Sequence, residues 1–436
     1  MWGWMLRYRE YKDSGFHWLG DIPANWSVSR MKYLFTEINE RSIDGSGDLL
    51  SVSQYTGVTK RSDGVEDGDQ LTNAASLEGY KQVKRGDLVT NIMLAWNGSL
   101  GFSPFAGITS PAYSIYRLKE NYSTQFFHYL LRTDRYKSEY KRNSTGVVES
   151  RLRLYTDDFF AMSSLVPPIE EQTAIATFLD RKTALIDRAI AQKERLIELL
   201  RERQQILIQQ AVTRGLDPNV ELKDSGVEWL GEVPRHWEVI RLKNHIDLLT
   251  GFPFESKKYV EEGVKLARGI NVKEGKFNWD DLRCWPNIDP YLEKFRLRTG
   301  DVLIAMDGSK VGKNFTIVKT EDLPVLLLQR VARLRTSTNL SSEFLYWNIA
   351  NKSFLEYINT AKTDPMVPHI SPANINDFTL ALPPIEEQLY ISSHINHASD
   401  KMKNTVRLQK RQITKLREFR ATLVDAAVTG KVRVEV

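Results

Sequence analysis

The sequence predicts a mixed α/β (α+β) protein in which two globular domains are separated by two long antiparallel helices packed as a coiled coil. Three observations support this prediction. A string of fifteen residues occurs twice, a "PPIEEQ" motif occurs twice ahead of a stretch with helical periodicity, and the two segments bracketed by these repeats match each other poorly. We therefore expect a pseudo-two-fold tandem repeat of two like folds that differ in detail.

The two repeated motifs indicate that the chain is a tandem duplication. The string "KDSGFHWLGDIPANW" begins at Lys12, and "KDSGVEWLGEVPRHW" begins at Lys223, 211 residues later. The motif "PPIEEQ" begins at Pro167 and returns at Pro383, 216 residues later. Two copies are too few for a solenoid, which needs at least three stacked units. A molecule with pseudo-two-fold symmetry is the expected product.

Each "PPIEEQ" motif is typical of the start of a long helix, and we expect helices over residues 167–214 and 383–430. Proline is tolerated in the first helical turn, and Glu170 and Glu171 place negative charge beside the positive end of the helix dipole. No glycine or proline interrupts the first helix before Gly215, which follows a basic residue as at many helix ends. At 1.5 Å per residue, such a helix is roughly 65 Å long.

An apolar stripe runs along one face of each expected helix, at steps of three, four or seven residues. In the first helix the stripe consists of Ile175, Leu179, Ile186, Ile190, Ile197, Leu200, Leu207 and Ala211. The residues found 216 positions later are all apolar, namely Ile391, Ile395, Met402, Val406, Ile413, Leu416, Leu423 and Ala427. Because a whole domain separates the helices, we expect them to pack on each other in antiparallel orientation. The alternative is that each helix covers its own domain.

The two bracketed segments, residues 27–160 and 238–376, are expected to be domains of one α/β fold. Each contains a short β-rich run, "DLVTNIML" in the first and "DVLIAM" in the second, closed by the turn residues "NGS" or "DGS". Each also carries a helix-like aromatic stretch, "STQFFHYLLRTDRYKSEY" or "SSEFLYWNIANKSFLEYI". The repeated strings lie ahead of these domains, in residues 1–26 and 215–237. Two like domains on matched supports suggest a scaffold for two different recognition surfaces.

This order of variable domain, "PPIEEQ" helix, "KDSGVEWLGEVP" string, second variable domain and second "PPIEEQ" helix resembles the specificity subunit of type I restriction-modification systems. The resemblance covers almost the whole chain. It implies that each variable segment is a target-recognition domain, which reads one half of a split double-stranded DNA sequence. It also implies that the helices dock two methyltransferase subunits, and that restriction subunits join the full complex. Charged pairs on the helices are candidate docking contacts, with a solvated face as the alternative: Arg201 and Glu202, Arg417 and Glu418.

The resemblance further implies that this chain is not an enzyme. The assembled complex would be a type I site-specific deoxyribonuclease and adenine DNA methyltransferase, with S-adenosylmethionine, ATP and magnesium bound by the partner subunits and none of them by this chain. The residues agree with this expectation. "GSKVGKN" from Gly308 has one residue too few for a phosphate-binding loop and offers Asn314 where a hydroxyl should hold magnesium. The seven histidines show no metal-ligand spacing.

Composition adds few constraints on the compartment and the partners. A single cysteine, Cys284, excludes a disulfide within the chain and any multi-cysteine metal site. No run of about 18 apolar residues offers a membrane span, and no secretory signal is recognisable. We therefore expect a cytoplasmic protein without a membrane partner. The net charge of +5 is a mild bias toward polyanions and by itself a weak indication of nucleic-acid binding.

Two different reading domains held apart by a rigid rod predict a bipartite, asymmetric DNA target with an unread gap. The half-sites would be spaced by about one helical turn, roughly 34 Å. Two other interpretations stay open from the sequence: a subunit of a system that only methylates DNA, and a structural adaptor whose variable domains bind proteins. Salt dependence separates the adaptor, because DNA binding weakens steeply as salt is added.

Loop residues with side chains suited to phosphates and base edges are the candidate DNA contacts. In the first domain they are Gln54, Tyr55, Thr59, Lys60, Arg61, Asn97, Ser99, Lys141, Arg142, Ser144 and Arg151. In the second domain they are Lys257, Lys258, Tyr259, Arg268, Asn271, Ser309, Lys310, Lys313, Asn314 and Lys362. For any one of them, a solvated surface position is the alternative.

Four tryptophans recur in the repeated strings, Trp18 and Trp26 in the first copy and Trp229 and Trp237 in the second. Tryptophan side chains can stack on bases. However, residues that read different sequences should differ between the copies, whereas these four do not. We therefore expect a packing role, in which each string braces a variable domain against the helix ends.

Overall fold

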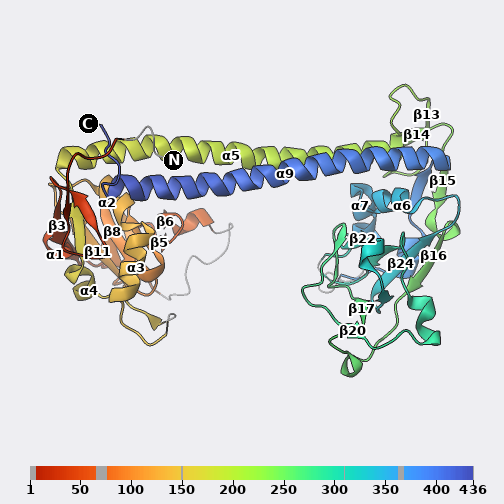
Figure 1. Cartoon of the computed structure of the whole chain (residues 1–436), viewed down its shortest axis with the longest axis horizontal. Coiled ribbons are helices and arrows are strands. Elements are labelled where there is room, and N and C mark those ends of the chain that lie inside the picture. The colour runs from red at the N-terminus through yellow and green to blue at the C-terminus, as the bar shows by residue number, and fades with distance from the viewer. Residues whose placement is uncertain (1–5, 65–75, 149–150, 309, 362–367, 436) are drawn as a thin grey trace. The chain divides into compact units, whose positions relative to one another are not determined.

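A computed structural model describes residues 6–64, 76–148, 151–308, 310–361 and 368–435. The chain forms two compact units (Figure 1). The first unit consists of Met1–Lys193 and Arg411–Val436, and the second consists of Glu194–Lys410. Each unit therefore combines one variable domain with parts of both long helices.

A four-stranded antiparallel sheet forms the centre of each variable domain, and the strand order is the same in both. In the first domain the order is β4 (Phe35–Ile38), β11 (Tyr113–Leu118), β8 (Asp87–Asn91) and β9 (Leu100–Phe102). In the second it is β16 (Ile246–Thr250), β24 (Val331–Thr336), β21 (Val302–Ala305) and β22 (Phe315–Ile317). The two β-rich runs of the sequence form β8 and β21, whose residues are all buried. The prediction of two like α/β domains is confirmed.

Each aromatic stretch forms two short helices rather than one. In the first domain these are α2 (Thr124–Leu131) and α3 (Asp134–Asn143), and in the second they are α6 (Ser342–Ile349) and α7 (Lys352–Ala361). The Ser123 side chain accepts a hydrogen bond from the Phe126 backbone N–H and so begins α2. Aromatic side chains of both helices are fully buried, including Phe126 of α2 and Tyr140 of α3.

Smaller elements complete the first domain. The paired strands are β5 (Leu50–Ser53) with β6 (Gly57–Lys60), and β7 (Lys81–Val83) with β10 (Gly107–Thr109). The helices are α1 (Met31–Leu34), α4 (Thr156–Ala161) and the 3₁₀ turns η1 (Arg61–Gly64) and η2 (Ala95–Asn97). These elements lie outside the central sheet, whose edge strands are β4 and β9.

The second domain carries a further sheet of three strands, β20 (Cys284–Trp285), β17 (Val264–Ala267) and β23 (Val325–Leu327). Its other elements are β18 (Val272–Lys273), β19 (Lys276–Phe277), α8 (Pro372–Asn376) and the 3₁₀ segments η4 (Leu242–Asn244), η5 (Ser256–Lys258), η6 (Pro290–Phe295) and η7 (Thr320–Asp322). Cys284 is buried in the three-stranded sheet. The two domains thus share a central sheet and differ around it.

Short strand pairs connect each variable domain to its repeated string. The strings form the hairpins β1 (Tyr11–Asp13) with β2 (Asp21–Pro23), and β13 (Leu222–Asp224) with β14 (Glu232–Pro234). The start of each domain then pairs with its end, β3 (Ser27–Arg30) with β12 (Ser163–Val166), and β15 (Glu238–Arg241) with β25 (Thr379–Leu382). Entry and exit strands of a domain therefore lie side by side, directly before each long helix begins.

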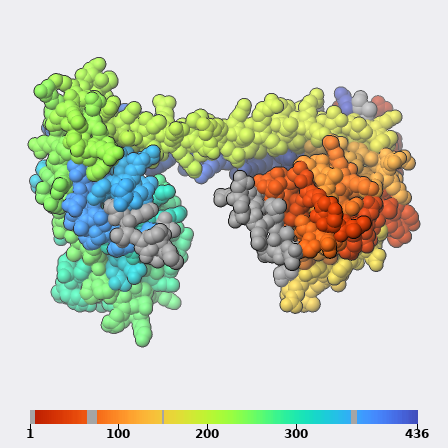
Figure 2. Space-filling view, turned by 180° about the vertical axis from the view of Figure 1, so that it is seen from behind, coloured from red at the N-terminus to blue at the C-terminus, as the bar shows by residue number. Residues whose placement is uncertain are grey.

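The long helices are α5 (Ile169–Arg214) and α9 (Ile385–Val428), and each begins in one unit and ends in the other. In the first unit, Lys193 Nζ donates to Gln412 Oε1 at 2.5 Å. In the second unit, Ile208 of α5 and Ile391 of α9 belong to one buried cluster. A later position of α5 thus lies beside an earlier position of α9, which confirms the antiparallel pair. Figure 2 shows α5 lying along the red and orange surface of the first unit.

The apolar stripe explains this packing. The stripe residues that are buried are Ile175, Leu179, Ile186, Ile190, Ile197, Ala211, Ile391, Ile395, Ile413, Leu423 and Ala427. The stripe residues that are half-buried are Leu200, Leu207, Met402, Val406 and Leu416. Within the described part of the chain, no helix is long and apolar enough to cross a membrane.

Candidate nucleic-acid interface

The repeated strings are tied to the repeated "PPIEEQ" motifs by a buried tryptophan. The Trp26 and Trp237 side chains are fully buried. Trp26 Nε1 donates to Glu171 Oε2 at 2.9 Å, and Trp237 Nε1 donates to Glu387 Oε1 at 3.1 Å. Because a buried indole N–H needs an acceptor, the second glutamate of the motif and the last tryptophan of the string form one unit. The predicted packing role of these tryptophans is confirmed.

The other pair of tryptophans packs on the variable domains. The Trp18 ring lies edge-on to Tyr136 at a centroid distance of 5.0 Å. Trp229 stacks on Phe378 at 6.3 Å, and its Nε1 donates to the backbone oxygen of Thr379 at 3.2 Å. Each string therefore contacts a helix end through one tryptophan and a variable domain through the other. We call each string, together with the Glu and Gln of its "PPIEEQ" motif, a mount.

The glutamine of each motif binds the residue that begins α2 or α6 in the adjoining domain. Gln172 Oε1 accepts from the Ser123 backbone N–H at 2.9 Å, while its Nε2 donates to the Pro167 carbonyl at 2.8 Å. Gln388 makes the same two bonds, to the Ser341 N–H at 2.8 Å and to the Pro383 carbonyl at 2.8 Å. These buried amides satisfy backbone groups that would otherwise lack partners. Neither bond was foreseen from the sequence, although the repetition of the glutamine was a signal.

A buried ion pair fixes the central sheet of each domain. Asp87 receives two hydrogen bonds from Arg117, from Nε at 2.8 Å and from Nη2 at 2.9 Å. Asp301 receives the same pair from Arg335, at 2.7 and 2.8 Å. Both carboxylates are buried, and each raises the pKa of its guanidinium through these hydrogen bonds. Each carboxylate also accepts a backbone N–H from the turn before its strand, that of Lys84 at 2.8 Å or of Arg298 at 2.7 Å, so both pairs are structural.

Tyr55 is a strongly exposed candidate of the first domain, at the tip of the β5–β6 hairpin, with 83% of its surface accessible. Side chains hold the backbone of this turn. Arg132 Nη2 donates to the carbonyl oxygens of Gln54 at 3.1 Å and Tyr55 at 3.0 Å. Ser53 Oγ accepts from the N–H groups of Tyr55 and Thr56. Tyr55 is therefore an exposed aromatic side chain on a fixed turn.

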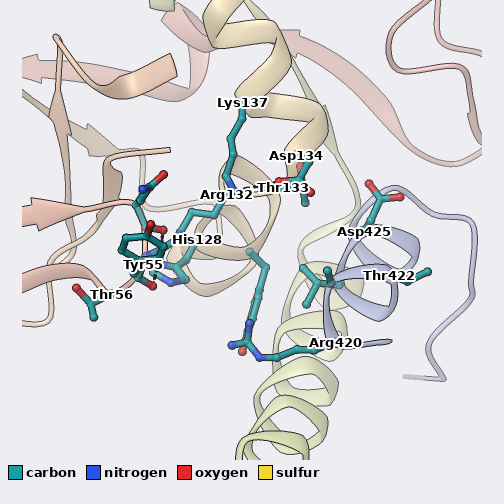
Figure 3. Close-up of a pocket in the computed structure, with 14 residues that line it drawn as sticks. Tyr55, Thr56, His128, Arg132, Thr133, Asp134, Lys137, Arg420, Thr422 and Asp425 are labelled. Atoms are coloured by element: carbon teal, nitrogen blue, oxygen red, sulfur yellow. Dashed lines mark hydrogen bonds and ion pairs between the residues drawn. The ribbon is translucent and has the colours of Figure 1, made fainter. Parts of the chain in front are cut away.

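A pocket of about 620 Å³ lies beneath this turn and is lined by the turn itself, the α2–α3 segment and the end of α9 (Figure 3). Three basic side chains line it, Arg132, Lys137 and Arg420. Burial, with the neighbouring charges of Arg132 and Arg420, lowers the pKa of His128 to about 4. His128 is therefore neutral at physiological pH.

Three candidates follow the turn along β6 and into η1. Thr59 and Lys60 are half-buried on the strand, and Arg61 is exposed. Lys60 Nζ contacts Asp48 Oδ2 at 2.6 Å and lies 5.5 Å from the centroid of the Phe105 ring. Lys60 therefore has local partners, whereas Arg61 presents its charge at the surface.

A second group of candidates gathers where the β8–β9 loop meets the end of α3. Lys141 Nζ lies 5.8 Å from the centroid of the Trp96 ring, beside the half-buried Asn97. Arg142 is exposed and pairs with Glu139 at 2.8 Å. Lys141 at the end of α3 thus lies beside the β8–β9 loop, although the two are distant in the sequence.

The remaining candidates of the first domain lie after α3. Ser144 is half-buried, and its Oγ donates to the Tyr140 carbonyl at 2.7 Å, as a local helix-end contact. Arg151 is exposed. Of these two, only Arg151 presents an outward charge.

In the second domain, η5 carries two exposed lysines. Lys257 is exposed, and Lys258 is exposed while pairing with Glu255 at 2.7 Å. Tyr259 follows them and is half-buried, with its hydroxyl 3.5 Å from the Phe254 carbonyl oxygen. The two lysines are the surface-accessible members of this group.

The β21–β22 loop supplies the other basic group of the second domain. Lys310 and Lys313 are exposed, and Asn314 is half-buried. The Asn314 carbonyl accepts from the Ala305 N–H at 2.9 Å, which closes the loop at its base. Ser309 and Lys362 lie outside the described residues.

Two candidates are wrong as direct DNA contacts, because their side chains are buried. Ser99 is 3% exposed and donates to Asn97 Oδ1 at 2.8 Å. Asn271 is 1% exposed and donates to the carbonyls of Asn278 and Asp281. Arg268, which was grouped with Asn271, is mostly buried and pairs with Asp281 at 2.9 Å. Loop composition indicated accessible polar groups at these positions, but the loops fold inward on them.

The exposed faces of the long helices keep the charged residues that the sequence singled out. Arg201, Glu202, Arg417 and Glu418 are all exposed. Among the described residues, no group of three or more His, Cys, Asp or Glu side chains is placed to hold a metal ion.

Comparisons with known proteins agree with this architecture. No family model matches the chain. The chain is 23% identical to the type I restriction enzyme MjaVIII specificity subunit of Methanocaldococcus jannaschii over 99% of its length and 98% of that protein. It is 30% identical to the EcoAI specificity subunit of Escherichia coli over 45% of this chain and 34% of that protein.

Solved structures share the fold over nearly the whole chain. The structure of a chain from work on complex assembly and conformational transition of the type I R-M system covers 93% of this chain, with a TM-score of 0.71 and 16% identity. The HsdS subunit from Thermoanaerobacter tengcongensis covers 94%, with a TM-score of 0.55 and 16% identity. Over nearly its whole length the chain, with its duplicated mounts and paired long helices, is therefore similar in sequence to a specificity subunit of a type I restriction enzyme and shares the fold of the HsdS subunit.

Proposed function

We propose that the two variable domains each read one half of a bipartite, asymmetric DNA site. The main observation behind this proposal is that the supporting contacts are the same in both domains, whereas the loop side chains are not. The Trp–Glu and Gln mounts and the Asp–Arg pairs recur bond for bond, whereas the exposed loop side chains differ between the domains. Two domains with the same supporting contacts and different exposed loops are suited to reading two different DNA sequences.

The accessible basic side chains support DNA as the ligand of both domains. In the first domain they are Arg61, Lys141, Arg142 and Arg151, and in the second they are Lys257, Lys258, Lys310 and Lys313. Lysine and arginine side chains at a surface neutralise DNA phosphates, and base-edge contacts then provide specificity. We propose that these residues, with Gln54 and Tyr55, make the DNA contacts.

The long helices are the proposed docking surface for two methyltransferase subunits. Large apolar side chains remain exposed on them, including Leu196, Leu199 and Ile206 of α5 and Leu389 and Tyr390 of α9. Such side chains, grouped along a helix whose other face is already packed, are typical of an interaction surface. Figure 2 shows one side of α5 in full view. Restriction subunits, S-adenosylmethionine, ATP and magnesium belong to the partners in this proposal.

A map of methylated bases tests the function directly. Genomic DNA from source cells with and without this gene would be read by single-molecule sequencing. We expect one asymmetric, gapped motif to disappear when the gene is deleted. A methylation map that stays unchanged, in cells that express the methyltransferase partner, would contradict the proposal and favour the adaptor interpretation.

A domain exchange tests the division of labour. Replacing residues 27–160 by the corresponding segment of another specificity subunit should change one half of the motif and leave the other half as it was. The matched control is the exchange of residues 238–376, which should change only the opposite half. If either exchange altered both halves, the model of two independent reading domains would be wrong.

A further inference from the structure

The side chains of Arg330, Asp307 and His369 meet on the surface of the second domain, where β21 ends and β24 begins. Arg330 Nε lies 3.2 Å from Asp307 Oδ2. His369 Nδ1 lies 2.6 Å from the other carboxylate oxygen, Oδ1. The Arg330 side chain is 72% exposed, so most of its guanidinium faces solvent. We call this group the Arg330 cluster, and none of its members was among the candidates taken from the sequence.

The backbone of Arg330 has an uncommon conformation. Its φ of 69° is the only positive φ of a non-glycine residue in the described part of the chain. Arg330 belongs to a turn in which the Val331 N–H donates to the Leu328 carbonyl at 3.3 Å. Glycine or asparagine is the usual residue where a turn needs positive φ, because a β-carbon is strained there. Arginine at this position opposes folding, and strain of this kind concentrates at functional sites.

The first domain provides a comparison, because its backbone has the same hydrogen bonds at this place. The Ile370 N–H donates to the Met306 carbonyl at 3.0 Å, and the Leu154 N–H donates to the Ile92 carbonyl at 3.0 Å. These bonds align the ends of β21 and β8 and the segments that pair with them.

The neighbouring positions can therefore be matched between the domains. Asp307 follows Met306 as Met93 follows Ile92, and His369 precedes Ile370 as Arg153 precedes Leu154. Arg330 directly precedes β24, and Ala112 directly precedes β11. These are the two strands that carry the arginines of the sheet ion pairs. The first domain thus has Met93, Arg153 and Ala112 where the second has the Arg330 cluster. If the two domains read different sequences, their base contacts must differ in side chain. Matched backbone positions with different side chains are therefore candidates for such contacts.

The chemistry of the cluster fits one class of ligand. A guanidinium can donate two hydrogen bonds to guanine O6 and N7 in the major groove, which is the most common specific contact between an arginine and a base. Because Asp307 already contacts Nε, the Arg330 side chain is partly fixed before DNA binds, and binding costs less conformational entropy. The contact with His369 fixes the Asp307 carboxylate in the same way. We propose that Arg330 reads a guanine in the half-site of the second domain, and that Asp307 is its positioning residue. This inference rests on the proposed function.

The test uses the full chain co-expressed with its methyltransferase partner. The probes are DNA duplexes that carry the methylated motif of the wild-type complex, with each G·C pair of both halves replaced in turn. In the variant Arg330→Gly, we expect discrimination at one G·C pair of one half-site to fall about 10- to 100-fold, while the other half-site is read as before. Its melting temperature should not fall, because glycine suits the turn.

Two further variants and a control separate the role of each residue. Asp307→Asn keeps the shape but loses the ion pair, and we expect a loss of roughly 3- to 10-fold at the same G·C pair. Arg330→Lys keeps the charge and should lose part of the discrimination. Arg296→Ala is the matched control, since Arg296 is also exposed in this domain and pairs with Glu293 at 3.3 Å. It should leave every base preference unchanged.

Several outcomes would overturn the inference. A loss of affinity that is equal for all duplexes, with a weaker salt dependence, would make Arg330 a phosphate contact instead. Unchanged discrimination in Arg330→Gly, a lower melting temperature in that variant, or a half-site without guanine would each sink it. These results differ from a failure of the proposed function, in which the wild-type complex itself would yield no gapped motif.

Discussion

The two variable domains make equivalent contacts with the long helices and within their central sheets, and they differ in their loops. Ser123 and Ser341 begin equivalent helices, α2 and α6, so positions along these helices correspond. The Tyr129 hydroxyl donates to Asp180 of α5 at 2.7 Å, whereas the matching residue, Trp347, donates to Asn396 of α9 at 3.2 Å. The contact between domain and helix is thus kept even where both residues have changed.

The residues beneath the Tyr55 turn differ between the two domains. His128 and Arg132, beneath the Tyr55 turn, correspond to Tyr346 and Ala350 in the second domain. The Arg132 bonds that hold the Tyr55 turn therefore belong to the first domain, as the Arg330 cluster belongs to the second. The two domains thus differ at these surfaces, while their mounts and sheet ion pairs are the same.

The largest expected effect comes from removing a mount tryptophan. Trp26→Ala and Trp237→Ala should each lower the free energy of unfolding of their own unit by about 3–5 kcal/mol, because a fully buried indole leaves a cavity. Denaturant titration with a probe in each unit would measure this. Trp26→Phe is the control, since it keeps much of the volume and loses the bond to Glu171, at a cost of about 1–2 kcal/mol. A large effect in only one unit would break the equivalence of the mounts.

The sheet ion pairs should give the next largest effect. Asp87→Ala and Asp301→Ala each leave a partly buried guanidinium without its carboxylate, and we expect a destabilisation of about 2–4 kcal/mol in either domain. Double variants that also replace Arg117 or Arg335 by methionine should recover part of this loss. Thermal unfolding of the single and double variants gives the coupling energy. A pair with no coupling would not fix the sheet.

The smallest expected effect is a pH dependence confined to the first unit. The pKa of His128 is lowered from 6.5 to about 4, chiefly by burial. Between these values the unfolded chain binds a proton that the folded chain does not, so stability is full above pH 6.5 and falls as the pH drops toward 4. We expect a loss of no more than about 3 kcal/mol across this window.

The second domain supplies the matched variant for this measurement. His128→Tyr introduces the residue found at the corresponding position of α6, Tyr346, and should flatten the dependence of stability on pH between 4 and 6.5. Stability curves of the wild type and the variant at several pH values would show the difference. Equal slopes in both proteins would mean that His128 does not titrate in this way.

Much of the fold was predictable because its signals are local or repeated. The start of α5 is set by the prolines and glutamates of its motif, and its packing face by apolar residues at helical spacing. By contrast, the split of the aromatic stretch into α2 and α3 depends on how those rings fill the core. Burial of Ser99 and Asn271 was likewise unpredictable, because loop residues of the same type lie at the surface or inside according to the path of the loop.

The sequence by itself determined that the chain is a duplication, that two long helices carry matching apolar stripes, and that no enzyme motif is present. The tertiary structure decided which side chains connect segments that are distant in the sequence. Trp26 reaches Glu171 and Asp87 reaches Arg117 across long stretches of chain, and Arg330 meets Asp307 and His369 only after β21 and β24 have paired. Periodicity reports on neighbours within a few residues, whereas these bonds depend on the folded path of the whole domain.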